Sequence, residues 1–535
     1  SQRPGTDPAR LAALWAAGEA WPEAAEAWRA AGVAAVRTGQ LAEAEALFDR
    51  ARAAAHAAAD VPLQLRVLEA AMPTRLLRHG PEATVAELQA LQPDAADRQA
   101  CVRRLLLIGE AEMSRMRPAD AHAAAAEAMA LGDESALDDA DFDERLLVDT
   151  TLLYGRTLAW TGQAGTGVRL LQAACERADG QADLRTRLRV RSTLADVLVA
   201  AGQRGRSVAV QRENLVLAQR LGERFERAVT ASNLALYELL IGDAPGCLAA
   251  ADQALHDFEA MGVAHVNRPM CAAVFGMAAG HAGRFDLALR ALAPLLGRPG
   301  EPLADPVRRN VANVRSMLAL YLGDIDQAQA WLPPLDDELP LTLRVSSLAV
   351  RLRWCDWTGI DPQAERRRMA ALFDAHPALR DDPLYYRHWA PWDDDPGAVA
   401  RLDDMAQRER AAGAPGSARA LELMALQIRA RADGLQRSTP RAAARRVAVA
   451  DDTARRAQAL ATELPQGLHP AVLPSEAHWT VAQVLYAAGQ PADAERLCAA
   501  ATAWVDAATL PADAAAGGPR WRARHPVHGP LLQGR

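Results

Sequence analysis

Residues 28–51, WRAAGVAAVRTGQLAEAEALFDRA, decide the fold of this 535-residue chain. On both sides of Gly39, small and apolar residues recur at steps of three and four, which gathers them on one face of each of two helices. Gly39 allows the left-handed turn that ends the first helix, and Gly32 lets the two helices approach closely. One such pair cannot bury its apolar face by itself, so the pattern predicts helix pairs that stack in series.

The same pattern recurs along the chain with a period of about 40 residues. The interval between Gly80 and Gly162 spans two periods, and Pro118 takes the place of glycine between them. Regularity weakens after Asp361 and returns around Gly489. The period predicts an all-α protein of roughly a dozen helix pairs. The glycines that mark the predicted turns before Asp361 are Gly39, Gly80, Gly162, Gly202, Gly242, Gly283, Gly323 and Gly359.

The spacing of the small and aromatic residues resembles the tetratricopeptide repeat. Trp28, Ala31, Gly32, Ala35, Gly39, Ala44, Phe48 and Ala51 match that repeat at nearly every signature position. The resemblance implies a right-handed superhelical solenoid of antiparallel helix pairs, in which the first helix of each pair lines a concave groove. The period of about 40 residues exceeds the usual 34 and is similar to that of long-helix variants in bacterial regulators.

Changes in composition divide the chain into five parts. We expect a junction helix from a missing N-terminal part at 1–20, repeats at 21–375, a Pro- and aromatic-rich insertion at 376–397, further helical repeats at 398–510 and a tail at 511–535. The insertion is placed by its density of proline, which breaks helices. Residues after 398 return to helical periodicity, at about 398–411, 416–433, 440–463, 475–488 and 491–507.

The tail carries a second resemblance. Residues 521–532, WRARHPVHGPLL, are similar to a closing F-x-x-R-x-P-V-x-x-x-L-L segment of multidomain bacterial regulators, with Trp521 for Phe and His525 for Asn. Those regulators join an output domain to a STAND-type ATPase and a C-terminal tetratricopeptide sensor. The resemblance implies that this chain is a fragment whose partners include its own N-terminal ATPase and output domain.

Composition excludes several classes of function. The net charge is −7, and all 60 basic residues are Arg, so the chain has neither a P-loop Lys nor a Schiff-base Lys. The 12 His are dispersed, and the pair His525 and His528 lacks a third metal ligand. The six Cys form no C-x-x-C pair, and no long apolar run spans a membrane. We therefore expect a cytoplasmic, non-enzymatic protein with no metal and no cofactor.

Polar residues on predicted first helices are the binding candidates. Asn233 follows Ser232 and precedes Leu234-Ala235, and in tetratricopeptide proteins an Asn beside such a pair commonly clamps a peptide backbone, because its amide both donates and accepts. Hydrogen bonding between helices is the alternative role for these residues. The same geometry places six further candidates in the groove: Tyr237, Arg191, Asp196, Asn310, Asn313 and Met317.

An aromatic group near the insertion is a further candidate. Tyr385, Tyr386, Trp389 and Trp392 lie close together in a chain with only 5% aromatic residues, and Trp354 and Trp357 precede them. They fit a ligand cage or a partner-docking patch, since aromatic side chains supply contact energy at interfaces. They fit equally a hydrophobic cap where the repeats become irregular.

These signals together predict a binding and sensing module that takes a peptide, a protein segment or a small effector. A plain protein–protein scaffold is one alternative. A nucleic-acid-binding repeat protein is the other, through the cluster of Arg441, Arg445, Arg446, Arg455 and Arg456. The acidic net charge argues against that second alternative.

Overall fold

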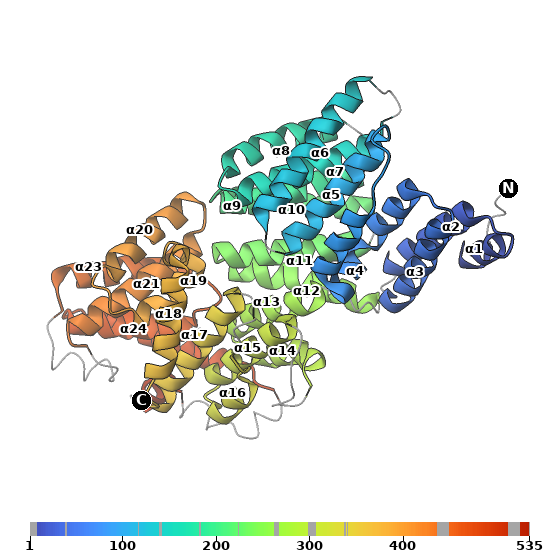
Figure 1. The fold of residues 1–535 in the computed structure, drawn as a ribbon. Coiled ribbons are helices and arrows are strands. Elements are labelled where there is room, and N and C mark those ends of the chain that lie inside the picture. The colour runs from blue at the N-terminus through green and yellow to red at the C-terminus, as the bar shows by residue number, and fades with distance from the viewer. Residues whose placement is uncertain are drawn as a thin grey trace. The chain divides into compact units, whose positions relative to one another are not determined.

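The computed structural model describes residues 8–37, 40–115, 117–138, 142–180, 183–222, 224–261, 267–297, 306–335, 339, 341–435, 449–511 and 525–533. Every regular element in these ranges is a helix, and a single isolated bridge pairs Arg284 with Thr509. The fold is an all-α, tetratricopeptide-like solenoid of sequential antiparallel helix pairs (Figure 1). No helix within the described ranges is both long enough and apolar enough to cross a membrane.

The chain forms two compact units. Unit 1 comprises Ser1–Thr230 and His256–His265, and unit 2 comprises Ala231–Leu255 and Val266–Arg535. The helices of unit 1 are α1 (Pro8–Ala17), α2 (Trp21–Arg37), α3 (Leu41–Ala57), α4 (Val61–Ala90), α5 (Arg98–Ser114), α6 (Pro118–Asp138), α7 (Glu144–Trp160), α8 (Ala164–Asp179), α9 (Leu184–Ala200) and α10 (Arg204–Leu221). Helices α11 (Arg224–Ile241) and α12 (Ala244–Ala260) contribute residues to both units.

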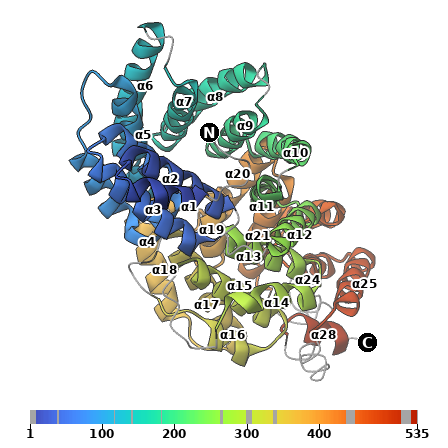
Figure 2. The same cartoon turned by 90° about the vertical axis from the view of Figure 1, so that its right-hand side faces the viewer.

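After α12 the helix pairs continue in unit 2, and Figure 2 shows the next helices stacked in chain order. These are α13 (Asn267–His281), α14 (Phe285–Leu292), α15 (Pro306–Tyr321), α16 (Ile325–Trp331) and α17 (Leu341–Thr358). They are followed by α18 (Gln363–Ala375), η2 (Pro377–Arg380), α19 (Pro383–Trp389), η3 (Ala390–Trp392), α20 (Ala398–Ala411), α21 (Pro415–Ala432), α23 (Asp451–Glu463), η4 (Leu464–Gln466), α24 (Pro474–Ala487), α25 (Pro491–Ala507) and α28 (His528–Gln533). A short 3-10 turn, η1 (Ala293–Leu295), follows α14.

The predicted turns contain left-handed glycines. Gly202, for example, has φ 71° between α9 and α10, a conformation that costs an L side chain steric strain. Gly80 lies within α4 at φ 76° and ψ 162°, so this long element is two helices joined at a kink. Except for Gly39, which lies outside the described residues, all the turn glycines named from the sequence have positive φ.

Glycines inside the helices set how closely the two helices of a pair approach. A Cβ built on Gly32 would lie 2.6 Å from the Phe48 ring, and one on Gly155 would lie 2.8 Å from Leu171 Cγ. Gly276 faces Leu292 in the same way, at the same spacing along the chain. At these glycines of the repeat pattern, a side chain from the paired helix therefore occupies the space that a Cβ would need.

The insertion at 376–397 forms short helices that pack into the core. Tyr386 and Trp389 are buried beside Phe373 and belong to one hydrophobic cluster with residues of α17, α18, α20 and α21. The Tyr386 hydroxyl donates to Asp393 Oδ2 at 2.9 Å and accepts from Arg401 Nη1 at 2.8 Å. Tyr386 and Trp389 are therefore part of the hydrophobic core of unit 2.

Unit 2 closes on itself, since its late helices contact its early ones. The Trp504 indole on α25 donates to the His281 carbonyl at 3.1 Å, and Thr509 N donates to Gly283 O at 2.8 Å. At another point a Cβ on Gly416 would lie only 2.3 Å from Gly242 O, so α21 begins against the turn between α11 and α12. An open stack would make none of these contacts, because its repeats touch only their neighbours.

Candidate functional site

The connector between η4 and α24, residues 467–473, and the start of α24 together contact α13, α15 and α17. His281 on α13 donates through Nδ1 to Val472 O at 2.7 Å, and Tyr321 on α15 donates its hydroxyl to Ala471 O at 2.9 Å. Arg353 on α17 forms an ion pair with Glu476, at the start of α24. Side chains from repeated helices thus hold a short segment of the same chain by its backbone carbonyls.

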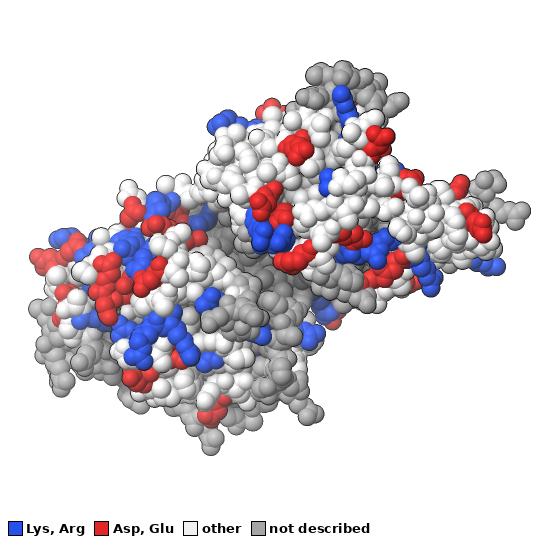
Figure 3. All heavy atoms as spheres, in the orientation of Figure 1, with Lys and Arg blue, Asp and Glu red and all other residues white. Residues whose placement is uncertain are grey.

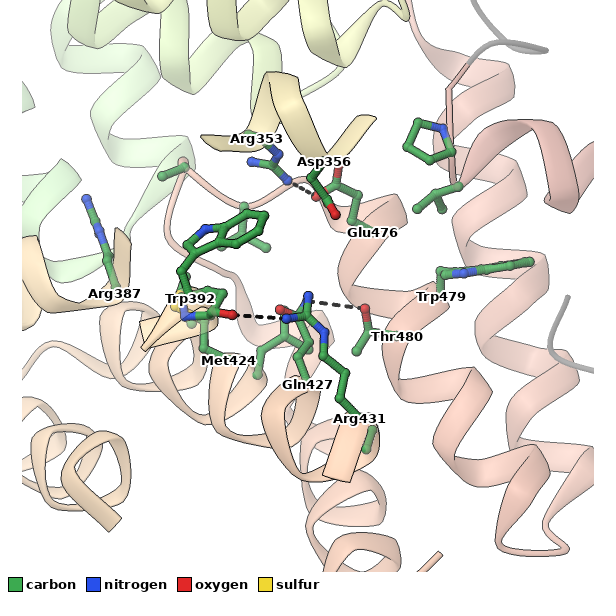
Figure 4. Close-up of a pocket in the computed structure, with 18 of the residues that line it drawn as sticks. Arg353, Asp356, Arg387, Trp392, Met424, Gln427, Arg431, Glu476, Trp479 and Thr480 are labelled. Atoms are coloured by element: carbon green, nitrogen blue, oxygen red, sulfur yellow. Dashed lines mark hydrogen bonds and ion pairs between the residues drawn. The ribbon is translucent and has the colours of Figure 1, made fainter. Parts of the chain in front are cut away.

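A cavity of about 210 Å³ lies beside this connector (Figure 4). Four parts of unit 2 form its walls: α15 with α17, the segment from α19 to η3, α21, and the connector with α24 and the tail. Its polar and aromatic lining consists of Arg353, Asp356, Trp357, Arg387, His388, Trp392, Gln427, Arg431, Glu476, Trp479, Thr480 and Gln483. The apolar lining includes Met317, Leu423, Met424, Val472 and Val527.

The ion pair of Arg353 and Glu476 stands at one end of the cavity (Figure 4). The Arg353 guanidinium also lies over the rings of Tyr321 and Trp357, at 5.2 and 5.5 Å from their centroids. Its Nη1 is 3.4 Å from the Tyr321 hydroxyl, whose pKa burial raises to about 12. Tyr321 is therefore a neutral donor to the connector at physiological pH.

Two hydrogen bonds position the polar groups at the other side of the cavity. Gln427 Nε2 on α21 donates to Thr480 Oγ1 on α24 at 3.4 Å, and Arg431 Nη1 donates to Pro391 O at 3.1 Å (Figure 4). Burial lowers the pKa of His388 to about 3, and the nearby positive charges of Arg387 and Arg353 add to the effect. His388 consequently lines the cavity as a neutral imidazole.

The C-terminal tail lines the cavity through Pro526 and Val527. Behind them the rings of His525 and His528 stack at 3.6 Å between centroids, and His528 Nε2 lies 2.9 Å from the buried Ser475 hydroxyl. His525 Nδ1 accepts from two backbone N–H groups, which leaves Nε2 to face Glu476 at 3.6 Å. The HPVH pair is therefore part of the tail's docking contact. Among the described residues, no group of three His, Cys, Asp or Glu side chains could hold a metal ion.

Three of the predicted groove residues lie on α15. Asn313 is buried and donates to Ser347 Oγ at 2.8 Å and Ser346 Oγ at 3.3 Å, which ties α15 to α17. Asn310 Nδ2 lies 3.6 Å from Met270 Sδ on α13. Met317 alone among the three lines the cavity. Asn313 thus makes the hydrogen bonds between helices that the sequence analysis kept as the alternative role.

The remaining groove candidates lie on α9 and α11. Asn233 is half-buried and Tyr237 is buried, both on the part of α11 that belongs to unit 2. Arg191 and Asp196 lie on α9 in unit 1, where Arg191 forms ion pairs with Asp179 at 2.8 Å and with Glu213. None of these four residues lines the cavity in unit 2. A ligand at Arg191 would have to compete with two carboxylates.

The aromatic group divides between core and cavity. Tyr386 and Trp389 are buried in the core, and half-buried Tyr385 packs against the same cluster. Trp392 lines the cavity together with Trp357. Sequence reasoning missed Arg353, Gln427, Arg431 and Glu476, since each sits within an ordinary helical pattern and only the closure of unit 2 brings them together.

The arginine cluster is only partly within the described residues. Arg441, Arg445 and Arg446 lie outside them, whereas Arg456 pairs with Asp403 at 2.7 Å and with Asp452 at 3.0 Å. Arg455 approaches Asp452 at 3.5 Å. On the face shown in Figure 3, acidic and basic side chains of the described residues are interspersed. This mixture gives no support to a nucleic-acid surface on that face.

The fold and the cavity define a tetratricopeptide-like helical-repeat protein. No protein-family model matches this sequence, and no curated protein sequence matches it either.

Several solved structures are similar to the chain. The apo form of the quorum sensor NprR from B. thuringiensis has 13% identity and a TM-score of 0.39, over 68% of this chain and 99% of that one. A Rap protein complexed with competence and sporulation factor has 14% identity and a TM-score of 0.40, over 76% of this chain and 98% of that one. Naa15/Naa10 bound to HypK-THB has 12% identity and a TM-score of 0.19, over 98% of this chain and 89% of that one.

Proposed function

We propose that this chain is a non-enzymatic sensor module whose effector site is the cavity in unit 2. One observation carries the proposal: the cavity is walled by segments far apart in the chain, from Met317 on α15 to Val527 in the tail. A ligand there contacts the early repeats, the connector and the tail together. Binding would therefore favour the closed arrangement of unit 2 over any arrangement in which these segments separate.

The volume of the cavity limits the size of the effector that it can bind. A cavity of about 210 Å³ is somewhat larger than one of about 150 Å³ that accommodates benzene, and smaller than the roughly 300–1,000 Å³ of drug-sized sites. It suits a small molecule or one anchoring side chain of a partner. An extended peptide along the faces of α13 and α15 would meet the connector, which already contacts those two helices.

The wider role that we propose is control of a linked ATPase and output domain in a bacterial regulator. The resemblance of residues 521–532 to the closing segment of such regulators supports it, and part of that segment touches the cavity through Pro526 and Val527. The coding sequence upstream of Ser1 tests this role. A P-loop followed by a Walker-B strand would support the linked ATPase, and their absence would remove it.

A cavity-filling variant tests the effector site. Met424→Trp places a bulky ring at the cavity wall, whereas Met270→Trp places the same ring at an exposed position on α13 outside the lining. In a thermal-shift screen of small metabolites and short peptides, we expect a ligand that raises the Tm of the wild type and of Met270→Trp but not of Met424→Trp. A ligand that stabilises all three equally would place the effector elsewhere.

The scaffold alternative predicts a different result. If the chain only holds another protein, a stoichiometric partner would bind Met424→Trp as tightly as wild type, and the screen would yield no stabilising small molecule. Nucleic-acid binding would instead show as an affinity for RNA or DNA that falls steeply with added salt.

A further inference from the structure

The charges that line the cavity favour an anion. The lining includes three guanidinium groups, those of Arg353, Arg387 and Arg431, and two carboxyl groups, those of Asp356 and Glu476. His388 adds no positive charge at neutral pH, because its pKa lies at about 3. The lining therefore holds one more positive than negative group, within a partly enclosed space where charges interact more strongly than in water.

The carboxyl group of Glu476 is already engaged. Glu476 forms the ion pair with Arg353 and also faces His525 Nε2 at 3.6 Å. A cationic ligand at Glu476 would have to displace Arg353, and the positive charges of Arg387 and Arg431 in the lining would oppose it. The net positive charge of the lining therefore favours an anionic ligand over a cationic one.

The position of Arg431 suits recognition of a planar or tetrahedral anion. Its Nη1 donates to Pro391 O at 3.1 Å, which fixes the guanidinium at the wall of the cavity across from Arg353 (Figure 4). A guanidinium presents five N–H donors in a fixed plane and commonly binds carboxylate or phosphate through two of them. An anion at Arg431 would therefore meet a guanidinium whose position the bond to the backbone already fixes.

The rest of the lining suits a flat, apolar body. The indoles of Trp357 and Trp392 and the side chains of Met317, Leu423 and Met424 form the apolar walls. Arg353 lies over the Trp357 ring at 5.5 Å from its centroid, which orients both groups. Flat rings stack favourably on indole, and methionine adapts to irregular shapes.

We infer that the cavity binds a small organic anion, with a carboxylate or phosphate held by Arg431 and its neighbouring arginines and a flat ring held between Trp357, Trp392 and the methionines. This inference rests on the proposed effector site and names its ligand class. It adds that Glu476 competes with the ligand's anion for Arg353, so removing the charge of Glu476 strengthens binding.

The test uses four probes of equal ring size on the full chain: benzoate, phenyl phosphate, benzyl alcohol and benzylamine. Binding is followed by tryptophan fluorescence and by ligand-observed NMR. We expect benzoate or phenyl phosphate to bind at least about tenfold more tightly than benzyl alcohol, with benzylamine weakest. The better of the two anions identifies carboxylate or phosphate as the preferred group.

Two variants and a control show whether the anion binds in this cavity. Arg431→Gln should weaken the preferred anion by about tenfold, whereas Glu476→Gln should strengthen it. Arg408→Gln, at an exposed α20 residue paired with Asp404 and outside the lining, should leave it unchanged. Circular dichroism melts check that each variant is folded, and the two opposite signs cannot both arise from unfolding.

Two outcomes separate this inference from the proposed function. If no anion saturates, or if benzylamine binds best, the anionic class is wrong. If at the same time the thermal-shift screen yields a neutral or cationic ligand that Met424→Trp abolishes, the effector site still stands. If Arg431→Gln and Arg408→Gln weaken the anion equally, its binding is general surface attraction and the inference fails.

Discussion

At the scale of single residues, the glycines inside the helices carry much of the specificity of the fold. Gly155 on α7 packs directly on Leu171 of α8, and the missing side chain is what allows this contact. The positions of these glycines could be predicted from the sequence, because they recur at the same place in each repeat. The large residue that packs on each glycine could be predicted as well, because Gly32 and Phe48 are separated by the same number of residues as Gly155 and Leu171.

Gly155→Ala tests this contact. The new Cβ would lie 2.8 Å from Leu171 Cγ, so Leu171 or the helix must shift, and we expect a loss of about 1–3 kcal/mol in the free energy of unfolding. Gly165→Ala on α8 is the matched control, because a Cβ there meets no atom within 4 Å. That change should be neutral or stabilise by up to about 1 kcal/mol in urea denaturation. Equal losses in both variants would contradict the packing role.

The buried imidazole of His281 gives a pH dependence of known sign. Burial lowers its pKa from 6.5 to about 4. At pH 7 it is neutral in both folded and unfolded chains, whereas below about 6.5 the unfolded chain takes up the proton first. Stability is therefore lost as the pH falls from about 6.5 towards 4, by up to about 2 kcal/mol at pH 5.

Urea denaturation at pH 7 and pH 5 measures this effect. The wild type should lose stability between the two values, and His281→Gln, which keeps a donor for Val472 O but does not titrate, should lose less. His388 contributes in the same direction, so part of the slope should survive in the variant. An unchanged slope in His281→Gln would show that this side chain is not held neutral by burial.

At the scale of elements, the connector at 467–473 is the unexpected feature. Tyr321 holds it by a hydrogen bond to Ala471 O. In Tyr321→Phe this carbonyl loses its protein donor, and we expect a cost of about 1–2 kcal/mol to unit 2. Thermal denaturation should show a lower Tm, and hydrogen exchange should be faster at the start of α24. Protection of α24 equal to that of the wild type would mean that the bond does not fix the connector.

Much of the element order followed from the sequence, and the site did not. Helices at α20, α24 and α25 begin and end within a residue or so of their predicted bounds, because proline and glycine mark those ends. The Arg353–Glu476 pair joins residues 123 positions apart, and local periodicity carries no information on such a distance. The sequence predicted Asn233 and Asn313 as groove residues because both lie on first helices. Which groups surround each amide depends on how the neighbouring helices pack, and the local sequence does not show this.

At the scale of the whole molecule, the division into two units was not marked by composition. The boundary passes through α11 and α12, which are continuous helices with ordinary repeat patterns. The predicted boundaries at 375 and 397 both lie inside unit 2, where the intervening short helices join the core. The two units result from packing between residues far apart in the chain. Proline content reflects only where helices end, so it does not predict such units.

Trp504→Ala tests the closure of unit 2. The indole donates to His281 O and packs edge-on against Phe285, at 6.2 Å between ring centroids. Its removal should speed hydrogen exchange of α13 and α14 by about tenfold or more, because closure protects them. Exchange in α8 and α9 of unit 1 should stay at the wild-type rate. Unchanged exchange in α13 and α14 would show that the α25 contact does not hold the closed form.

Closure also limits how unit 2 can change in length. In an open array, tandem copying of one helix pair adds a copy and leaves every older interface intact. In unit 2, an extra pair inserted between α14 and α15 would carry His281 away from Val472 while leaving Tyr321 beside Ala471. The contacts between the connector and the early helices therefore fix the number of helix pairs from α13 to α24. We expect homologues of this chain to differ in this region by substitutions and not by the gain or loss of repeats.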